Sequence, residues 1–401
     1  MMPSSFFFTM KHTLFLLAAL VAASAPSVSA QDTDEPKLEF SPTGRLLLDG
    51  ALYASPDKEA FKDGLAISEI RLGTKAKYGK WDAKIDIGYA YGKVGLKDIY
   101  VQYNYDEANF LRAGSFIHHY GLQSTTNASM KISYDQPTAE SAFTTARLLG
   151  AMYVHSADKY LATVSAHVEP QSVILTPNQL GQQGYGVLTR LVAHPVHTGG
   201  NVVQFGISGG FASPNTSGDN KGHNVFTFAA NFPTQVDKVK ALDATMDNAM
   251  NLWKFSPELL LSTGPVALEA QYYFNRVNFR NNLHSFTGMG AYAMLRGLLT
   301  GGAYRYSVSD ACLATPSKGE CELVLGYSYT TLNDKKAQYI EDGRVFSGIY
   351  GGNANTLSAT LNYYINKYML ARLNYTYMHT FNNATFNTDL NIFQVRLQFL
   401  F

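Results

Sequence analysis

The C-terminal stretch Asp389–Phe401 restricts the possible fold more than any other part of the sequence. Apolar side chains occupy every second position from Phe393 to Phe401, and Gln394, Arg396 and Gln398 lie between them. Successive side chains of a strand point to opposite faces, so this segment has one apolar and one polar face. A strand between lipid and a water-filled lumen has this pattern, but one such strand also fits a soluble sandwich.

The same alternation recurs from Gly44 onwards in segments of roughly ten residues that are separated by Gly, Asn and Asp. In Trp81–Tyr89, for example, apolar residues alternate with Asp82, Lys84 and Asp86. This pattern predicts an all-β protein, a transmembrane antiparallel β-barrel of sixteen strands, with eighteen as the alternative.

The predicted connections fall into two groups, as expected for a barrel with short periplasmic turns and long extracellular loops. We expect tight turns around Tyr78, Asp106, Asp158 and Lys367, and long polar loops after Tyr120, Val168, Gly210 and Leu332.

Two regions interrupt the alternation. Residues 118–145 are too many for a routine connection, so they form either an extracellular loop or one folded into the lumen. Residues 171–252 are harder to interpret. Gly199–Ser213 and His223–Phe232 are predicted to be strands, and Pro233–Met250 a short helix or a long loop.

The N-terminus predicts an exported protein. Basic Lys11 precedes an apolar run from Leu14 to Ala23, and Val28-Ser29-Ala30 forms an A-x-A-like cleavage site. No other apolar run long enough for a membrane-spanning helix follows. We expect a signal peptide at 1–30, a short N-terminal segment at 31–43 and the barrel at 44–401.

Composition excludes several function classes. Without Lys11, the 32 basic residues become 31 and balance the 31 acidic ones, which argues against nucleic acid as a partner. The 26 Tyr fit the boundary between bilayer and water.

Cys312 and Cys321 flank a short polar segment, and in an oxidising compartment we expect a structural disulfide between them, because a metal site would need further ligands.

Several short segments, in order along the chain, resemble the phosphate-selective porins O and P. They are Glu69–Ala76, Lys97–Tyr100, Arg112–Phe116, Leu299–Gly302, Glu322–Ser328, Leu361–Ile365 and Val395–Phe399. The resemblance implies a sixteen-stranded homotrimeric barrel in the outer membrane of a Gram-negative bacterium, with an inward-folded loop and basic residues along the pore. The chain has Ile70-Arg71 where family members tend to carry two arginines. It has Ile117-His118-His119 where they carry Lys-Glu-Pro, so two expected basic side chains are missing or neutral.

Basic residues at the alternate strand positions that face the lumen are the candidates for pore lining and anion selectivity, because rings of Lys or Arg attract anions and replace their hydration. The candidates are Arg45, Arg71, Lys75, Arg112, Arg147, Arg190, Arg372 and Arg396, together with Lys131 in the long loop. The same polar faces of the strands also carry acidic residues, namely Asp49, Glu69, Asp82, Asp86, Asp98, Glu169, Glu269 and Glu322. The alternative is therefore a lumen wall of cross-strand ion pairs without a selective role. In the long loop, Asp135 and Glu140 are further candidates for lining the constriction.

Other chemistry is weakly supported. Adjacent His118 and His119 point to opposite faces of a strand and so cannot share a metal ion there. Ser165 and His167 share a face, but that spacing is common by chance, and the sequence contains no hydrolase or cofactor motif. We therefore predict no enzyme activity, no cofactor and no bound metal.

The sequence thus predicts an outer-membrane porin, a passive aqueous channel that contacts lipid and passes small polar or anionic solutes, phosphate among them. The alternative is a secreted or surface β-rich adhesin or glycan-binding protein without a pore.

Overall fold

Sixteen antiparallel strands close into a single barrel, so the predicted fold class and strand number are confirmed. The computed structural model describes residues 36–54, 60–125, 131–145, 147–169, 182–216, 223–383 and 386–401. The predicted signal peptide lies outside the described residues, and residues 38–401 form one compact unit. None of the described helices is long and apolar enough to cross a membrane.

The barrel strands follow one another around the ring in chain order, and β1 pairs with β20 to close it. They are β1 Leu38–Ala54, β2 Gly64–Tyr78, β3 Trp81–Ala90, β4 Lys93–Asn104, β5 Phe110–Phe116, β6 Leu148–Ser156, β7 Tyr160–Val168, β8 Tyr185–Thr198, β9 Asn201–Ser213, β12 Ala249–Thr263, β13 Val266–Phe279, β14 Phe286–Leu298, β17 Cys321–Glu341, β18 Arg344–Tyr363, β19 Met369–Asn383 and β20 Thr388–Leu400.

The remaining elements belong to three connections. The 3-10 helix η1 Gln123–Thr125 and helix α2 Thr138–Phe143 lie between β5 and β6. The hairpin of β10 Phe226–Asn231 and β11 Lys240–Met246 lies between β9 and β12, and that of β15 Tyr306–Ser307 and β16 Cys312–Leu313 between β14 and β17. Neither hairpin joins the barrel sheet.

Strand β20 shows how alternation becomes an apolar outer wall. Val395, Leu397 and Phe399 are 49%, 41% and 40% exposed, whereas the intervening Arg396 and Gln398 are buried. The outward side chains have no protein neighbours to cover them, and lipid is the solvent that suits them. The closed ring leaves no unpaired strand edge, which satisfies the backbone in an apolar medium.

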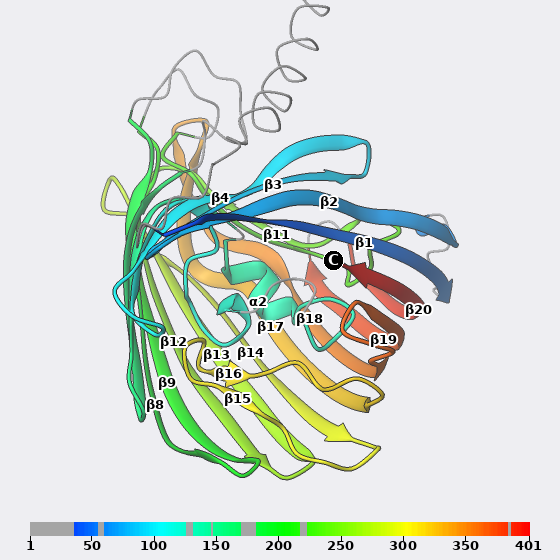
Figure 1. The fold of residues 1–401 in the computed structure, drawn as a ribbon. Coiled ribbons are helices and arrows are strands. Elements are labelled where there is room, and N and C mark those ends of the chain that lie inside the picture. The colour runs from blue at the N-terminus through cyan, green and yellow to red at the C-terminus, as the bar shows by residue number, and fades with distance from the viewer. Residues whose placement is uncertain are drawn as a thin grey trace, which may run out of the picture. The chain divides into compact units, whose positions relative to one another are not determined.

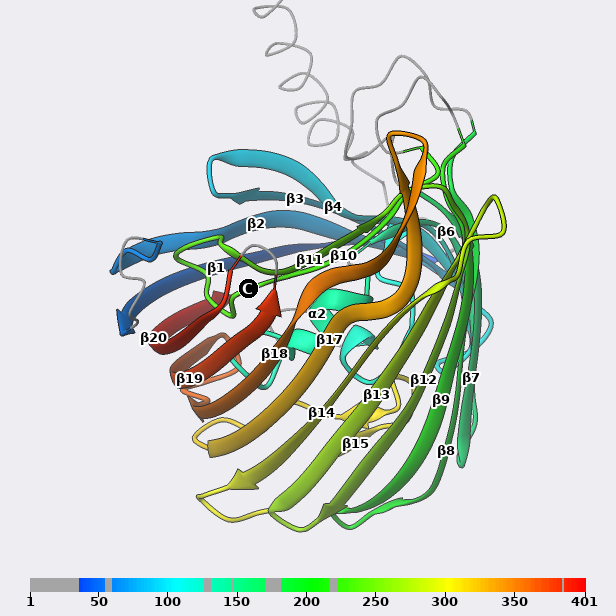
Figure 2. The same cartoon turned by 180° about the vertical axis from the view of Figure 1, so that it is seen from behind.

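Helix α2 lies inside the ring of strands in both views (Figures 1 and 2). It packs against β10, β13, β14 and β17. The long segment between β5 and β6, residues 117–147 without 126–130 and 146, is hereafter the α2 loop. Of the two predicted positions for this segment, the inward one is therefore observed.

Gly121 allows the α2 loop to approach the wall. Its φ of 84° lies in the left-handed region, and a Cβ there would collide with the side chain of Gln271 on β13. The Gly121 amide donates a hydrogen bond to Ser208 Oγ at 3.0 Å. A residue with a side chain would hold the loop away from β9 and β13.

Several sequence-based boundaries are wrong. Strand β1 begins at Leu38 rather than Gly44. No long loop follows Leu332, because β17 continues to Glu341 and turns tightly into β18. Residues 233–250 contain β11, whose Leu242, Ala244 and Met246 are buried, rather than a helix or an irregular loop.

Two further strand limits differ. β8 within the region 171–252 was not predicted. Strand β9 starts at Asn201 rather than Gly199, because Gly199 and Gly200 have positive φ and make the turn.

Candidate functional site

A band of opposite charges crosses the lumen face of the first strands. We call it the charged wall. It consists of Arg45 on β1, Glu69 and Arg71 on β2, Lys84 and Asp86 on β3, Lys97 and Asp98 on β4, and Arg147 just before β6.

The wall is a continuous network and not a set of isolated pairs. Glu69 accepts hydrogen bonds from Arg45 and from Arg71, the latter at 2.7 Å. Arg71 Nη1 also lies 3.7 Å from one carboxylate oxygen of Asp86 and 3.7 Å from one of Asp98. The ion pairs therefore link side chains within and between β1, β2, β3 and β4, which orders them.

Lys84 and Arg147 complete the wall. Lys84 Nζ lies 2.8 Å from Asp86 and 3.3 Å from Asp98, and Arg147 Nε lies 2.8 Å from Asp98. Lys97 has Glu69 and Arg147 among its electrostatic neighbours. With five cations and three carboxylates, the charged wall has an excess of positive charge.

Arg112 on β5 adds a further positive group near this wall. Its guanidinium donates to Gln102 Oε1 at 2.8 and 2.6 Å and lies 4.2 Å from the ring centre of Tyr100 and 5.4 Å from that of Phe116. Among the described residues, no carboxylate forms an ion pair with it. Aromatic faces stabilise the cation, and its acidic neighbours Asp98, Asp310 and Asp82 act on it without forming an ion pair.

Two arginines, on β19 and β20, bind the α2 loop instead of lining a pore. Arg372 donates to the carbonyls of Ser133 and Lys131 at 2.5 and 2.6 Å. Arg396 donates to the Tyr134 carbonyl at 2.9 Å and pairs with Asp49 through two hydrogen bonds of 2.6 and 3.1 Å. Both are structural residues in this fold.

The remaining candidates are also engaged elsewhere or exposed. Arg190 is fully buried and binds Glu258 through bonds of 3.0 and 2.7 Å, while its other donors hold the carbonyls of Asp310 and Ala311 in the β15–β16 connection. Lys131 pairs with Glu140 at 3.3 Å.

Burial raises the pKa of the Glu140 carboxyl, and Lys131 partly opposes the shift. Glu140 is thus a buried residue of α2 rather than a surface charge on the constriction. Lys75 is exposed and has no ion-pair partner among the described residues.

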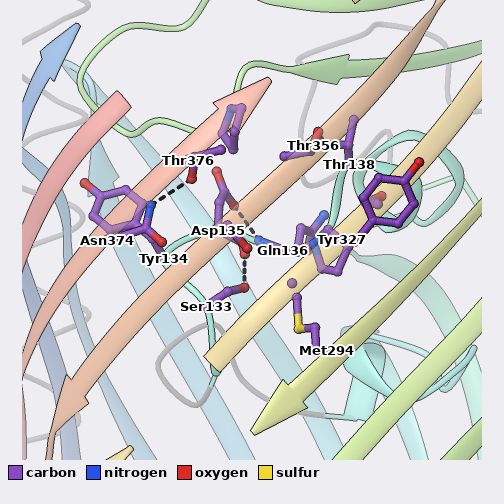
Figure 3. Close-up of a pocket in the computed structure, with 15 residues that line it drawn as sticks. Ser133, Tyr134, Asp135, Gln136, Thr138, Met294, Tyr327, Thr356, Asn374 and Thr376 are labelled. Atoms are coloured by element: carbon purple, nitrogen blue, oxygen red, sulfur yellow. Dashed lines mark hydrogen bonds between the residues drawn. The ribbon is translucent and has the colours of Figure 1, made fainter. Parts of the chain in front are cut away.

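The α2 loop packs closely against β14, β17, β18 and β19 around residues 133–138, and a cavity of about 170 Å³ remains nearer Lys131, Arg296 and Arg372. Figure 3 shows Ser133–Gln136 and Thr138 of the loop against Met294, Thr356, Asn374 and Thr376 of these strands. The cavity between them has a volume of about 30 Å³. That volume suits one or two water molecules.

Six of the predicted basic candidates are therefore ion-paired, and the ion-pair alternative describes most of the lumen. Lys75, Arg112 and Arg372 have no ion-pair partner among the described residues. Lys75, opposite Lys84, and Arg112 lie next to the charged wall, and Arg372 does not. Lys84 and Lys97 were missing from the predicted set. Lys84 alternates with Asp82 and Asp86, so the sequence pattern could have identified it. Lys97 does not follow the alternation, because a β-bulge between β3 and β4 shifts the pairing there by one residue.

The two cysteines do not form the predicted disulfide. The connection between β14 and β17 folds into the barrel and carries Cys312 next to Arg190 and Tyr306, whereas Cys321 starts β17 on the barrel wall. A short sequence separation therefore did not imply a closed loop.

Ser165 and His167 do not form a catalytic pair. The Ser165 hydroxyl donates to the Leu188 carbonyl at 3.4 Å. His118 stacks on Phe116 with ring centres 4.3 Å apart. No cluster of three potential metal ligands occurs among the residues that the structure describes.

Solved outer-membrane proteins share this fold. The trimer form of OmpT from Vibrio cholerae is 12% identical, with a TM-score of 0.53, covering 91% of this chain and 99% of that one. An anion-selective porin from Comamonas acidovorans is 11% identical, with a TM-score of 0.54 and coverages of 91% and 100%. Salmonella typhi OmpF in complex with daunomycin is 13% identical, with a TM-score of 0.52 and coverages of 92% and 99%. At these identities the likeness concerns the fold alone.

No curated protein matches the sequence. A model of one protein family does match it, over residues 48–401, and the description of that family is phosphate-selective porin O and P. The matched range contains nearly the whole barrel, whose apolar outer wall and charged lumen suit a channel in the Gram-negative outer membrane rather than a secreted binding protein. The chain therefore belongs to the phosphate-selective porin O and P family.

Proposed function

We propose that this outer-membrane channel conducts small anions in preference to cations and also passes small neutral polar solutes. The observation that carries the proposal is the composition of the charged wall, five cations against three carboxylates, next to Arg112 without a carboxylate partner. In a narrow lumen with apolar surroundings, an excess of fixed positive charge raises the local anion concentration and opposes cation entry.

Phosphate is one of the anions that we propose as a permeant solute. The family description supports it, and guanidinium groups such as those of Arg45, Arg71 and Arg147 suit phosphate oxygens. Ile70 and the Ile117-His118-His119 segment reduce the positive charge expected near the constriction. We therefore propose general anion selectivity and not exclusive phosphate transport.

Charge reversal tests this proposal. In planar bilayers under a KCl gradient, the reversal potential of the wild type should indicate anion preference, and Arg71→Glu and Arg112→Glu should shift it towards cation preference. Lys336→Glu, at an exposed lysine near the loop end of β17, is the matched control and should leave the potential unchanged. Equal potentials for the wild type and both wall variants would reject the assignment.

We further propose that the α2 loop sets the channel width and that the channel is a homotrimer. One of the OmpT structures is a trimer form, which supports the same assembly here. The outer wall also has apolar concave surfaces over β1, β2 and β18–β20, where Leu65, Leu373 and Val395 are exposed. A trimer should migrate as a high-mass band on a denaturing gel without boiling and as a monomer after boiling.

A further inference from the structure

A second cavity lies on the other side of the α2 loop, against β7, β8, β9 and β12. Its volume is about 240 Å³, larger than the cavity of about 150 Å³ that admits a benzene molecule. We call it the side cavity. Aromatic side chains dominate its lining: Tyr120, Phe143, Tyr185, Phe211, Phe226 and Phe228.

One cation enters this aromatic surface without a counter-charge. Lys254 on β12 donates to the Phe143 carbonyl at 2.5 Å, and its ammonium lies 4.5 Å from the ring centre of Tyr120. No carboxylate of the described chain pairs with it. An ammonium has three donors, so two remain available, and a buried cation of this kind is stabilised by an anion.

Other polar atoms at the side cavity also lack partners. Tyr120 is 3% exposed, and its hydroxyl forms no hydrogen bond within the described residues. The same holds for Nδ1 of His167, whose electrostatic neighbour is Lys254. Buried donors normally find an acceptor, so these unpaired groups indicate that an acceptor from outside the chain completes the site.

We propose that the side cavity binds a small aromatic monocarboxylate, with its ring between the aromatic side chains and its carboxylate on Lys254 and the Tyr120 hydroxyl. This inference deepens the proposed function, on which it rests, because it names a solute class for the anion channel. The apolar lining contributes through burial of the ring, and the charge-assisted hydrogen bond from Lys254 orients the solute.

The remaining charged and titratable groups of the lining favour a single negative charge. Glu169 is the only carboxylate among the described lining residues, and it opposes a dianion such as phosphate more strongly than a monoanion. Burial, reinforced by His167, lowers the pKa of His118 to about 3, so that this ring adds no positive charge at neutral pH. An organic cation would be repelled by Lys254.

Calorimetric titration of the purified protein in detergent micelles tests the proposal, with empty micelles as the blank. Benzoate should bind at least tenfold more tightly than acetate, benzylamine or inorganic phosphate. Lys254→Met should weaken benzoate binding tenfold or more, because it removes the charge and keeps the length of the side chain. Thr227→Trp, at an exposed lining position of β10, should weaken it by filling the cavity. Lys336→Met should bind like the wild type.

Heat-modifiable migration on a gel identifies folded variants, and Lys254→Gln replaces Lys254→Met if the latter does not fold. Equal binding of benzoate and acetate, or unchanged affinity after the Lys254 and Thr227 substitutions, would overturn the assignment. The reversal potential in KCl, measured without benzoate, tests the anion channel separately. A cation-selective wild type that still binds benzoate through Lys254 would reject the proposed function and keep the side cavity as a binding site.

Discussion

Removal of the Arg372 guanidinium should release the α2 loop without opening the barrel. Arg372 is 2% exposed, and its two hydrogen bonds to the carbonyls of Lys131 and Ser133 hold the loop against β19. Hydrogen bonds from a charged donor contribute about 1.5–3 kcal/mol each. Their loss in Arg372→Met should lower the free energy of loop release by at least about 3 kcal/mol, which raises the released population roughly 150-fold.

Some attachment remains in this variant. Arg396 still binds the Tyr134 carbonyl, and Asn362 still donates to the Ile132 carbonyl at 2.8 Å. We therefore expect fluctuating rather than permanent release. In single-channel recordings, Arg372→Met should show larger open-channel noise and a higher mean conductance, and limited proteolysis should cut within residues 117–147.

Arg276→Met is the matched control, because it removes an exposed arginine of β13 that contacts no part of the α2 loop. Its conductance should equal that of the wild type. If Arg372→Met forms a heat-modifiable barrel with wild-type conductance, noise and protease resistance, the hydrogen bonds to the loop do not determine the channel width and our reasoning is wrong.

Three other substitutions test separate parts of the structure. Glu258→Gln leaves the buried Arg190 without its counter-charge and should lower stability by about 3–5 kcal/mol, measured by denaturant unfolding in micelles; an unchanged midpoint would contradict the pair's role. Replacement of Phe226–Met246 by a short glycine linker should raise conductance and retain a heat-modifiable barrel, since this hairpin is not part of the barrel sheet; loss of the barrel would refute this. Val395→Arg places a charge on the lipid-facing side of β20 and should cost about 2–4 kcal/mol, seen as a lower yield of folded protein in the outer-membrane fraction; a normal yield would argue against lipid contact there.

The strand pattern of the barrel was largely predictable, because alternation has a period of two and each strand reports its own two faces. The outward Val395, Leu397 and Phe399 and the inward Arg396 and Gln398 lie as β20 alone predicts. Prediction failed where a bulge changes which face a side chain points to, as at Lys97, and where polar residues continue a strand beyond its alternating segment, as in β17.

The functional site was less predictable, since alternation places a basic residue in the lumen but does not name its partner. Arg71 and Arg396 have the same pattern in sequence, yet the first joins the charged wall and the second holds the α2 loop. Lys254 lies between Trp253 and Phe255, just beyond residues 171–252, in a segment for which no strand was predicted, so no sequence signal marked the side cavity.

The sequence by itself determined the closed antiparallel barrel and its apolar outer wall, because these follow from short-range periodicity and from the need to satisfy every backbone hydrogen bond in lipid. Only the tertiary structure decided what fills the lumen. The α2 loop is held by residues far away in sequence, such as Asn362 bonded to the Ile132 carbonyl. Contacts of this kind depend on which strands closure of the ring brings face to face across the lumen, and no local pattern of residues encodes that.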